Sequence, residues 1–374
     1  MAVPHGGPSW RPLMAAPYGG PLVARRGHMS RGRASEAKVG ICGGWQPAKD
    51  ICLFGQPWRK GHQVTTEYRI LSQQQAEHFL EHGFVAIKGC FSRDVAERAV
   101  REMWSRTGYD PDDPGTWAQK DIHMPGLNHF AVKDFAPRAW GAVCDLVGGE
   151  ERVNGTYNWS DAFIVNLGVR AEEPWAPPSP ASPGWHVDGD FFRHFLDSPE
   201  QGLLTLVLWT DVVHQGGATF VAGDSVAPVA RRLFEHPEGL LPGEFQTSAL
   251  VAQCREFLEA TGEAGDVYLL HPFVLHATAQ NTLRRPRVIT NPPVSLKEPM
   301  RFDRDRWEDH SLVEQAVLRG LGLDRCDFRP TAPRERVVPE RVRRQAEMRR
   351  AEEARLGTAH ASLGSFAAHA APPA

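Results

Sequence analysis

Two residues in the middle of the chain could bind a metal together. His186 and Asp188 are separated by one residue, within the segment Gly184-Trp185-His186-Val187-Asp188-Gly189-Asp190. On an extended segment, residues i and i+2 project from the same face, so this imidazole and this carboxylate would point at one spot. A His-x-Asp pair alone is more often a solvated loop. The metal hypothesis therefore depends on a third ligand elsewhere in the chain.

A downstream segment supplies both a third ligand and a cation. His276 lies 90 residues after His186, and Arg287 follows eleven residues later. Two histidines and one carboxylate with open coordination positions are typical of non-haem Fe(II) sites. The planar guanidinium of an arginine can donate two parallel hydrogen bonds to a carboxylate, which a lysine cannot do. This pattern predicts an iron site beside a site for an anionic co-substrate.

The third ligand has two candidates, because His271 precedes His276 by five residues. On an uninterrupted strand the two side chains would face opposite sides. The residue eleven positions after His271 is Thr282, which cannot pair with a carboxylate, whereas the same offset from His276 reaches Arg287. We therefore predict that His276 is the ligand and that His271 is structural.

With these residues in place, the sequence resembles the phytanoyl-CoA dioxygenase family of Fe(II)/2-oxoglutarate-dependent oxygenases. That family combines His-x-Asp, a distal His, an Arg eleven residues later and a Ser or Thr two residues after the distal His, which Thr278 matches. The resemblance spans roughly Tyr68 to Leu296. It implies Fe(II) held by His186, Asp188 and His276, and 2-oxoglutarate whose C5 carboxylate pairs with Arg287.

Other candidate residues follow from their position along the chain. Thr278 would add a hydroxyl to the 2-oxoglutarate site, although a strand threonine can equally pack by its methyl group. Asn166 is a further candidate for co-substrate binding. Arg284 and Arg285 are expected in solvent. No catalytic residue beyond the metal ligands is predicted. The candidates for substrate binding surround or follow the metal pair, where loops often close over a substrate: Trp185, Phe191, Phe192 and Arg193.

The resemblance implies a mainly β fold with flanking helices, namely a double-stranded β-helix (jelly roll, cupin-like) core behind an N-terminal helical layer. Apolar periodicity and caps predict helices from Ser72 to Leu80 and after Ser92. Apolar runs predict strands at 84–87, 161–169, 203–212, 267–270, 273–277 and 287–289, with 218–222 as the hairpin partner of 203–212. Two helical patterns, 226–234 and 248–258, predict an insertion between barrel strands.

The predicted domain organisation has three parts. Residues 1–66 are rich in Gly, Pro and Arg without apolar periodicity, which predicts a disordered tail. Residues 67–330 would form the oxygenase domain, with the helical insertion at about 225–260. Residues 331–374 would form a charged helical or disordered tail, with 339–355 as a solvated helix. Substrate specificity is expected in the Pro-rich loop 172–183 and in the insertion.

Composition excludes several classes of protein. The formal net charge is −3 over 374 residues, which gives no reason to expect nucleic acid or a membrane as a partner. The six cysteines are scattered without CxxC spacing, so they indicate reduced thiols in a cytoplasmic protein rather than disulfides or a zinc site. No apolar run approaches the length of a transmembrane helix.

The predicted function is that of an Fe(II)/2-oxoglutarate-dependent dioxygenase that hydroxylates a small molecule and uses O2, with release of succinate and CO2. Related halogenating oxygenases lack the carboxylate, so Asp188 favours hydroxylation, desaturation or another oxidation. Two alternatives stay open: a cupin-type metal-binding barrel that acts without 2-oxoglutarate, and a catalytically silent binding module. The sequence does not specify the substrate or the oligomeric state.

Overall fold

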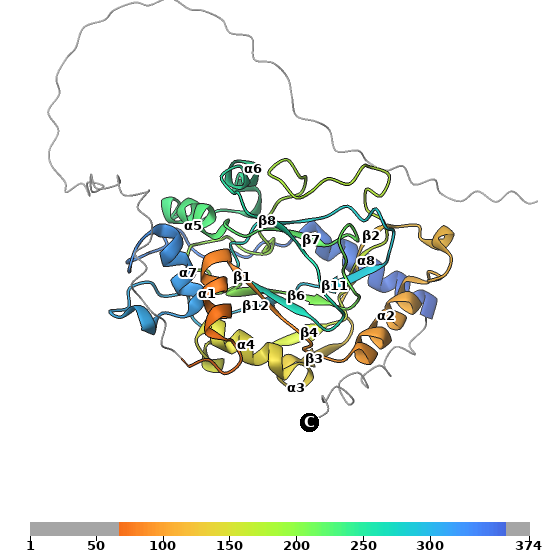
Figure 1. Cartoon of the computed structure of the whole chain (residues 1–374), viewed down its shortest axis with the longest axis horizontal. Coiled ribbons are helices and arrows are strands. Elements are labelled where there is room, and N and C mark those ends of the chain that lie inside the picture. Colours follow the sequence, from red (N-terminus) through yellow and green to blue (C-terminus); the bar gives the residue numbers. More distant parts are fainter. Residues whose placement is uncertain (1–66, 357–374) are drawn as a thin grey trace, which may run out of the picture. The chain divides into compact units, whose positions relative to one another are not determined.

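The computed structural model describes residues 67–356 (Figure 1), so the predicted N-terminal tail lies outside the described residues. Its helices are α1 Gln73–His82, α2 Arg93–Thr107, α3 Val132–Phe135, α4 Pro137–Val147, α5 Val226–Glu235, α6 Thr247–Val251, α7 Leu312–Leu321 and α8 Glu340–Leu356. Its strands are β1 Phe84–Ile87, β2 Asp121–His123, β3 His129–Ala131, β4 Asn158–Ser160, β5 Ile164–Asn166, β6 Leu203–Leu208, β7 Thr219–Ala222, β8 Phe257–Ala260, β9 Val267–Leu270, β10 His276–Thr278, β11 Arg287–Thr290 and β12 Pro293–Val294.

Two antiparallel sheets form the core. The larger sheet has the order β1-β9-β6-β11-β5-β2, with β12 also paired to β6. The smaller sheet has the order β10-β7-β8, and the isolated bridge between His186 and His276 extends it by one more segment. A third pair, β3 and β4, stands apart from both sheets.

The chain alternates between the two sheets, which defines the topology. It runs from β5 in the larger sheet to the His186 segment in the smaller one, back to β6, across to β7 and β8, back to β9, across to β10 and back to β11. Eight antiparallel segments that alternate in this way form a jelly roll. The predicted fold class, mainly β with flanking helices around a double-stranded β-helix, is confirmed.

The N-terminal helices begin directly after the predicted caps Ser72 and Ser92, and α1 continues to His82. Ser72 accepts a hydrogen bond from the Gln75 N–H, and the Gln75 side chain accepts one from the Ser72 N–H, which is a capping box. Gly83 ends α1 at φ 72°, and a Cβ there would lie 2.6 Å from Val226 and 2.8 Å from Val274. This position therefore requires glycine for both its backbone and its packing.

One predicted strand pairing and one predicted helix were wrong. Residues 218–222 are not the hairpin partner of β6, because β7 pairs with β10 and β8 in the smaller sheet. The second helical pattern, 248–258, contains only the short helix α6 and then enters strand β8. The 225–260 segment is thus part helix and part core strand.

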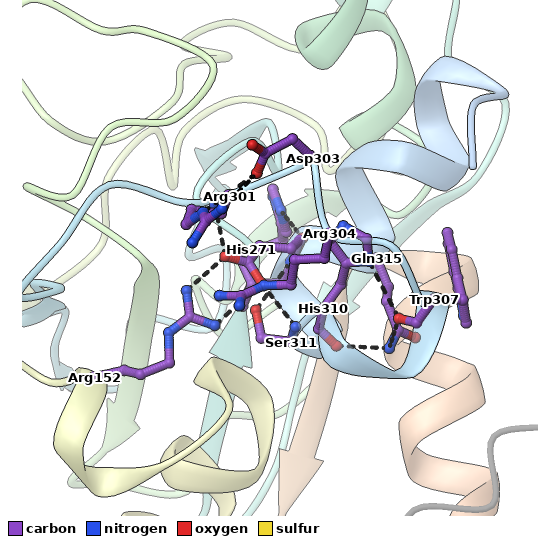
Figure 2. Close-up of polar contacts among 11 residues, drawn as sticks. Arg152, His271, Arg301, Asp303, Arg304, Trp307, His310, Ser311 and Gln315 are labelled. Carbon is purple, nitrogen blue, oxygen red and sulfur yellow. Dashed lines mark hydrogen bonds and ion pairs between the residues drawn. The ribbon is translucent and has the colours of Figure 1, made fainter. Parts of the chain in front are cut away.

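A buried carboxylate ties α7 to the region after α4. Glu314 accepts hydrogen bonds from Arg152 Nη1 and Nη2 at 3.1 and 2.5 Å, from Arg301 N–H at 2.7 Å and from Ser311 N–H at 2.8 Å. Figure 2 shows Arg152 and Ser311 converging on this network. The side chain of Glu314 has no exposed surface, so its charge depends on these partners and on Arg304, whose Nε lies 3.8 Å away.

We expect Glu314→Gln to lower the free energy of unfolding by roughly 3 kcal/mol. This is the low end of the range for breaking a buried ion pair, because Arg152 keeps some contact with water. Urea unfolding would measure the change. The matched variant Glu308→Gln alters an exposed carboxylate and should cost under about 1 kcal/mol. Equal effects of the two variants would contradict the assignment.

The same carboxylate should make the fold sensitive to acid. Burial alone would raise the pKa of Glu314, but the ion pair with Arg152 and the N–H groups of Arg301 and Ser311 outweigh it and lower the pKa. The stability that the ionised group contributes is present above its unfolded pKa of about 4.3 and is lost as the pH falls through the folded value. Unfolding measured between neutral pH and pH 3 should therefore show less acid destabilisation in Glu314→Gln than in the natural protein.

Candidate metal centre

The three predicted ligands lie together between the two sheets. The backbone N–H of His186 donates to the His276 carbonyl at 3.0 Å, and the His276 N–H donates to the His186 carbonyl at 3.0 Å. This antiparallel bridge places the two imidazoles on one face, with their ring centroids 4.3 Å apart. Asp188 follows at i+2 and joins them, as the extended spacing predicts.

The ligand atoms converge on one point. Asp188 Oδ1 lies 3.4 Å from His186 Nε2 and 3.6 Å from His276 Nε2, and the three ligand atoms lie within 4.8 Å of one another. Ligand atoms placed about 2.1 Å from one metal ion are roughly 3 Å apart at right angles. The cluster can therefore hold a metal ion with small adjustments of the side chains.

In each ligand, the side-chain nitrogen or oxygen that would not bind the metal makes a hydrogen bond. This hydrogen bond orients the atom that would bind the metal. His186 Nδ1 donates to the Gly184 carbonyl at 2.7 Å, and His276 Nδ1 donates to the Val274 carbonyl at 3.0 Å. A carbonyl can only accept, so each Nδ1 carries the proton and each Nε2 keeps a lone pair for a metal. Asn291 Nδ2 donates to Asp188 Oδ2 at 2.8 Å, which leaves Oδ1 for the ion. The residues present thus fit a divalent cation.

The charge of Asp188 also suits a metal. Burial alone would raise the pKa of Asp188, but the two neighbouring imidazoles lower it well below its usual range. Burial alone would lower the pKa of His186, and the Asp188 carboxylate outweighs that and raises it, so a metal ion would compete with a proton for Nε2. Asp188 is therefore ionised at neutral pH, which is the form that binds a cation.

A cavity of about 110 Å³ connects the three ligands to Arg287. Arg287 is buried, and its Nε donates to the Gly217 carbonyl at 2.8 Å while Nη1 donates to the Ile164 carbonyl at 3.2 Å. Burial lowers the pKa of Arg287 to about 10, against the influence of Asp121, so the group stays cationic at neutral pH. Gly217 has φ 77°, and a Cβ there would lie 2.7 Å from Asn166 Nδ2.

The register of β11 sets the distance between cation and metal site. Arg287, Ile289 and Asn291 alternate along the chain and line the same cavity. Arg287 stands at one end, and Asn291, which orients Asp188, stands four residues further, a span of roughly 13 Å along a strand. The same face of β11 therefore carries both the buried cation and the residue that hydrogen-bonds Asp188.

The other two predicted co-substrate residues differ in position. Thr278 lines the cavity beside His276 and Arg287. Asn166 is fully buried and lies outside the cavity lining; its Oδ1 accepts from the N–H groups of Gly168 and Val169, and its Nδ2 donates to the Ala279 carbonyl at 3.4 Å. The structure therefore does not bring Asn166 to the cavity, because its amide closes the turn after β5.

A second, outer pocket of about 560 Å³ opens beside His186 and Asp188. Of the four predicted substrate residues only Phe191 lines it. Trp185 turns to the opposite side and packs against Phe257, Phe192 is buried against His194, and Arg193 pairs with Glu335 at 2.7 Å. The structure therefore does not bring the side chains of Trp185, Phe192 and Arg193 to this pocket.

Much of the outer pocket is lined by residues that the sequence did not single out. They include His123, Gln201, Asn291, Arg341 and Gln345. The Pro-rich loop 172–183 is absent from this lining, and only Pro242 represents the 225–260 segment. Asn291 could have been found, since it shares the strand parity of Arg287; the residues of α8 carry no such signal.

The rejected candidates lie away from the cavity. Arg284 and Arg285 are exposed, as predicted. His271 is buried against α7, where its Nδ1 accepts from the Phe273 N–H at 3.1 Å and its Nε2 donates to the Val313 carbonyl at 3.2 Å. Burial lowers the pKa of His271 to about 3, so this histidine is neutral and structural.

Iron content should separate the two histidines. We expect His276→Ala to lose bound iron, because two remaining ligands cannot hold the ion. His271→Ala should keep close to one iron per chain, although it loses stability through two broken hydrogen bonds. Metal analysis of both folded variants measures this. Iron loss in His271→Ala with full content in His276→Ala would reverse the assignment.

No model of a protein family matches the sequence, and no curated protein matches it. Solved structures do show similarity. The non-haem α-ketoglutarate-dependent carbocyclase SnoK from nogalamycin biosynthesis is 19% identical, with 59% of this chain and 83% of that chain covered at a TM-score of 0.38. EctD from S. alaskensis is 18% identical, with 63% and 81% covered at 0.35. HygX from Streptomyces hygroscopicus, with nickel and 2-oxoglutarate bound, is 17% identical, with 59% and 85% covered at 0.33. Similarity at this level does not establish an activity for this chain.

Within residues 67–356, no helix is long and apolar enough to span a membrane.

Proposed function

We propose that this protein is an Fe(II)- and 2-oxoglutarate-dependent dioxygenase that hydroxylates a small molecule. One observation carries the proposal: the His186, Asp188 and His276 cluster and the buried Arg287 face the same cavity. A buried cation needs an anionic partner, and Arg287 has only backbone carbonyls within hydrogen-bonding distance among the described residues. A dicarboxylate that reaches the metal would supply that partner.

Each residue then has a defined task. Iron(II), when bound, supplies the centre at which 2-oxoglutarate and O2 combine, yielding succinate, CO2 and an oxidised substrate. His186, Asp188 and His276 would hold the ion on one side and leave the cavity side open. Arg287 would bind the C5 carboxylate through two hydrogen bonds, with Thr278 beside it. The outer pocket would place the substrate C–H next to His186 and Asp188 and exclude water.

The narrower assignment to the phytanoyl-CoA dioxygenase group is also part of the proposal. The eleven-residue offset from His276 to Arg287 and the Thr278 hydroxyl support it. Asp188 supports hydroxylation or a related oxidation over halogenation, because its carboxylate occupies the position that a halide would need. We retain the cytoplasm as the proposed location.

The alternatives make different predictions. A metal-binding barrel that acts without 2-oxoglutarate would not require a buried arginine in the cavity beside the metal site. A catalytically silent binding module would not require three side chains oriented to bind one metal ion. Purified protein should be loaded with Fe(II) and supplied with 2-oxoglutarate, O2 and a small-molecule extract of its source cells. We expect succinate in proportion to O2 consumed; iron-loaded protein that binds the ion but forms no succinate would contradict the proposal.

A further inference from the structure

The C-terminal helix α8 forms one wall of the outer pocket. Arg341 and Gln345 both line that pocket, and their spacing of four residues places them on the same face of the helix. The helix was predicted as solvated because its sequence is mostly Glu and Arg. Most of α8 is exposed, but Arg341 and Gln345 meet the pocket beside the metal cluster.

A buried ion pair fixes α8 in this position. Glu352 accepts a hydrogen bond from Arg106 Nε at 2.6 Å, and the Arg106 side chain has no exposed surface. Arg349 donates to the Gly126 carbonyl at 2.8 Å further along the same helix. Figure 1 shows α8 in blue at the side of the molecule where α2 lies, and α2 carries Arg106. The helix is therefore docked on the domain.

Arg106 also ties α8 to two other walls of the pocket. Its Nη2 donates to the Pro125 carbonyl at 2.6 Å and its Nη1 donates to the Asp161 carbonyl at 2.8 Å. Pro125 directly follows the pocket residue Met124, and Asp161 lies between the pocket residues Ser160 and Ala162. One buried guanidinium thus holds together three segments that contribute residues to the outer pocket.

Within the described lining, the formal charges of the outer pocket are paired. Arg341 donates to both oxygens of Asp190, at 2.6 and 2.8 Å. His123 lies 3.6 Å from Asp121. His186 and Asp188 belong to the metal cluster. The other polar side chains are neutral amides and hydroxyls, among them Gln201, Gln345, Ser160 and Thr290.

We propose that α8 is a substrate-recognition element, that Arg341 and Gln345 contact the substrate, and that the substrate is an uncharged molecule with several hydrogen-bonding groups. A charged substrate would lack an unpaired counter-charge in this pocket and would pay for its desolvation. Apolar lining residues such as Met124, Phe191 and Leu204 would cover its carbon skeleton. This inference rests on the proposed function, and it argues against a CoA thioester, whose phosphates would require unpaired basic side chains.

The test uses the full-length, iron-loaded protein and the substrate-stimulated rate of succinate release, expressed as a ratio to the rate without added substrate. The probes are the neutral, anionic and cationic fractions of the cell extract, separated by ion exchange, together with palmitoyl-CoA. We expect stimulation by the neutral fraction and none by the other three. Arg341→Met and Gln345→Ala should each reduce the ratio about tenfold, the effect of losing one hydrogen bond to the substrate.

Two controls separate recognition from folding. Arg350→Met changes an exposed arginine of the same helix outside the pocket lining and should keep the ratio. Arg341→Lys retains the positive charge opposite Asp190, so it should lower the ratio less than Arg341→Met does. Three outcomes would overturn the inference. They are stimulation by a charged fraction or by palmitoyl-CoA, no stimulation by the neutral fraction, and unchanged ratios in both pocket variants. Iron-loaded protein that never forms succinate with any probe would instead refute the proposed function.

Discussion

Asp188→Ala is expected to leave the protein folded and without bound iron. Asp188 Oδ1 is the atom that stands between the two Nε2 atoms, at 3.4 and 3.6 Å, so its removal leaves two neutral ligands with no charge opposite the cation. Without the ion, 2-oxoglutarate turnover should fall below detection. Metal analysis and succinate release from the same preparation measure both effects, and a melting curve establishes that the variant is folded.

Two matched variants sharpen this result. Asn291→Ala removes the hydrogen bond to Asp188 Oδ2 but keeps all three ligands, so iron affinity should weaken by roughly 10- to 100-fold rather than vanish. Asp190→Ala removes a carboxylate two residues away that pairs with Arg341, so iron content should stay the same. Normal iron content in Asp188→Ala would show that the cluster is not the metal site.

Arg287→Lys is expected to raise the apparent KM for 2-oxoglutarate by roughly 10- to 100-fold with iron binding intact. Lysine keeps the charge but loses the planar fork, so one charge-assisted hydrogen bond of about 1.5–3 kcal/mol disappears. The substitution also removes the donors to the Gly217 and Ile164 carbonyls that hold the guanidinium in place. Succinate release measured against 2-oxoglutarate concentration gives the change.

Arg284→Lys and Arg285→Lys are the matched controls, because both arginines are exposed in the turn before β11. Each should change the apparent KM by less than about twofold, as surface substitutions away from a site usually do. A large effect of Arg285→Lys without one of Arg287→Lys would mean that the eleven-residue offset points to the wrong arginine. The choice of His276, which uses the same offset, would then fail with it.

The sequence predicts that the three candidate ligands lie together, because the signal for it is local or periodic. His186 and Asp188 share a face through strand alternation, and β11 carries Arg287 inward by the same rule. Alternation also explains one error. Trp185 neighbours His186 in sequence, and neighbouring residues of an extended segment face opposite sides, so its indole packs against Phe257 instead of facing the pocket. Proximity along the chain was the wrong criterion there.

Long-range pairing explains the remaining errors. Strands β6 and β7 follow each other through a short connection, which favours a hairpin in sequence, yet they belong to different sheets. The partners of β7 are β8 and β10, which lie further along the chain. Likewise, the charge pattern of α8 is compatible with full solvation. Its contacts with distant parts of the chain, such as that of Glu352 with Arg106, 246 residues earlier, show that one face is docked.

The measurement that tests the account most directly is anaerobic binding of 2-oxoglutarate to the iron-loaded protein, followed by absorption spectroscopy. Chelation by a keto acid gives Fe(II) a visible charge-transfer band. We predict that this band develops with one equivalent of 2-oxoglutarate in the natural protein, needs a much higher concentration in Arg287→Lys and is absent in Asp188→Ala. A protein that binds iron at His186, Asp188 and His276 but shows no band at saturating 2-oxoglutarate would contradict the account.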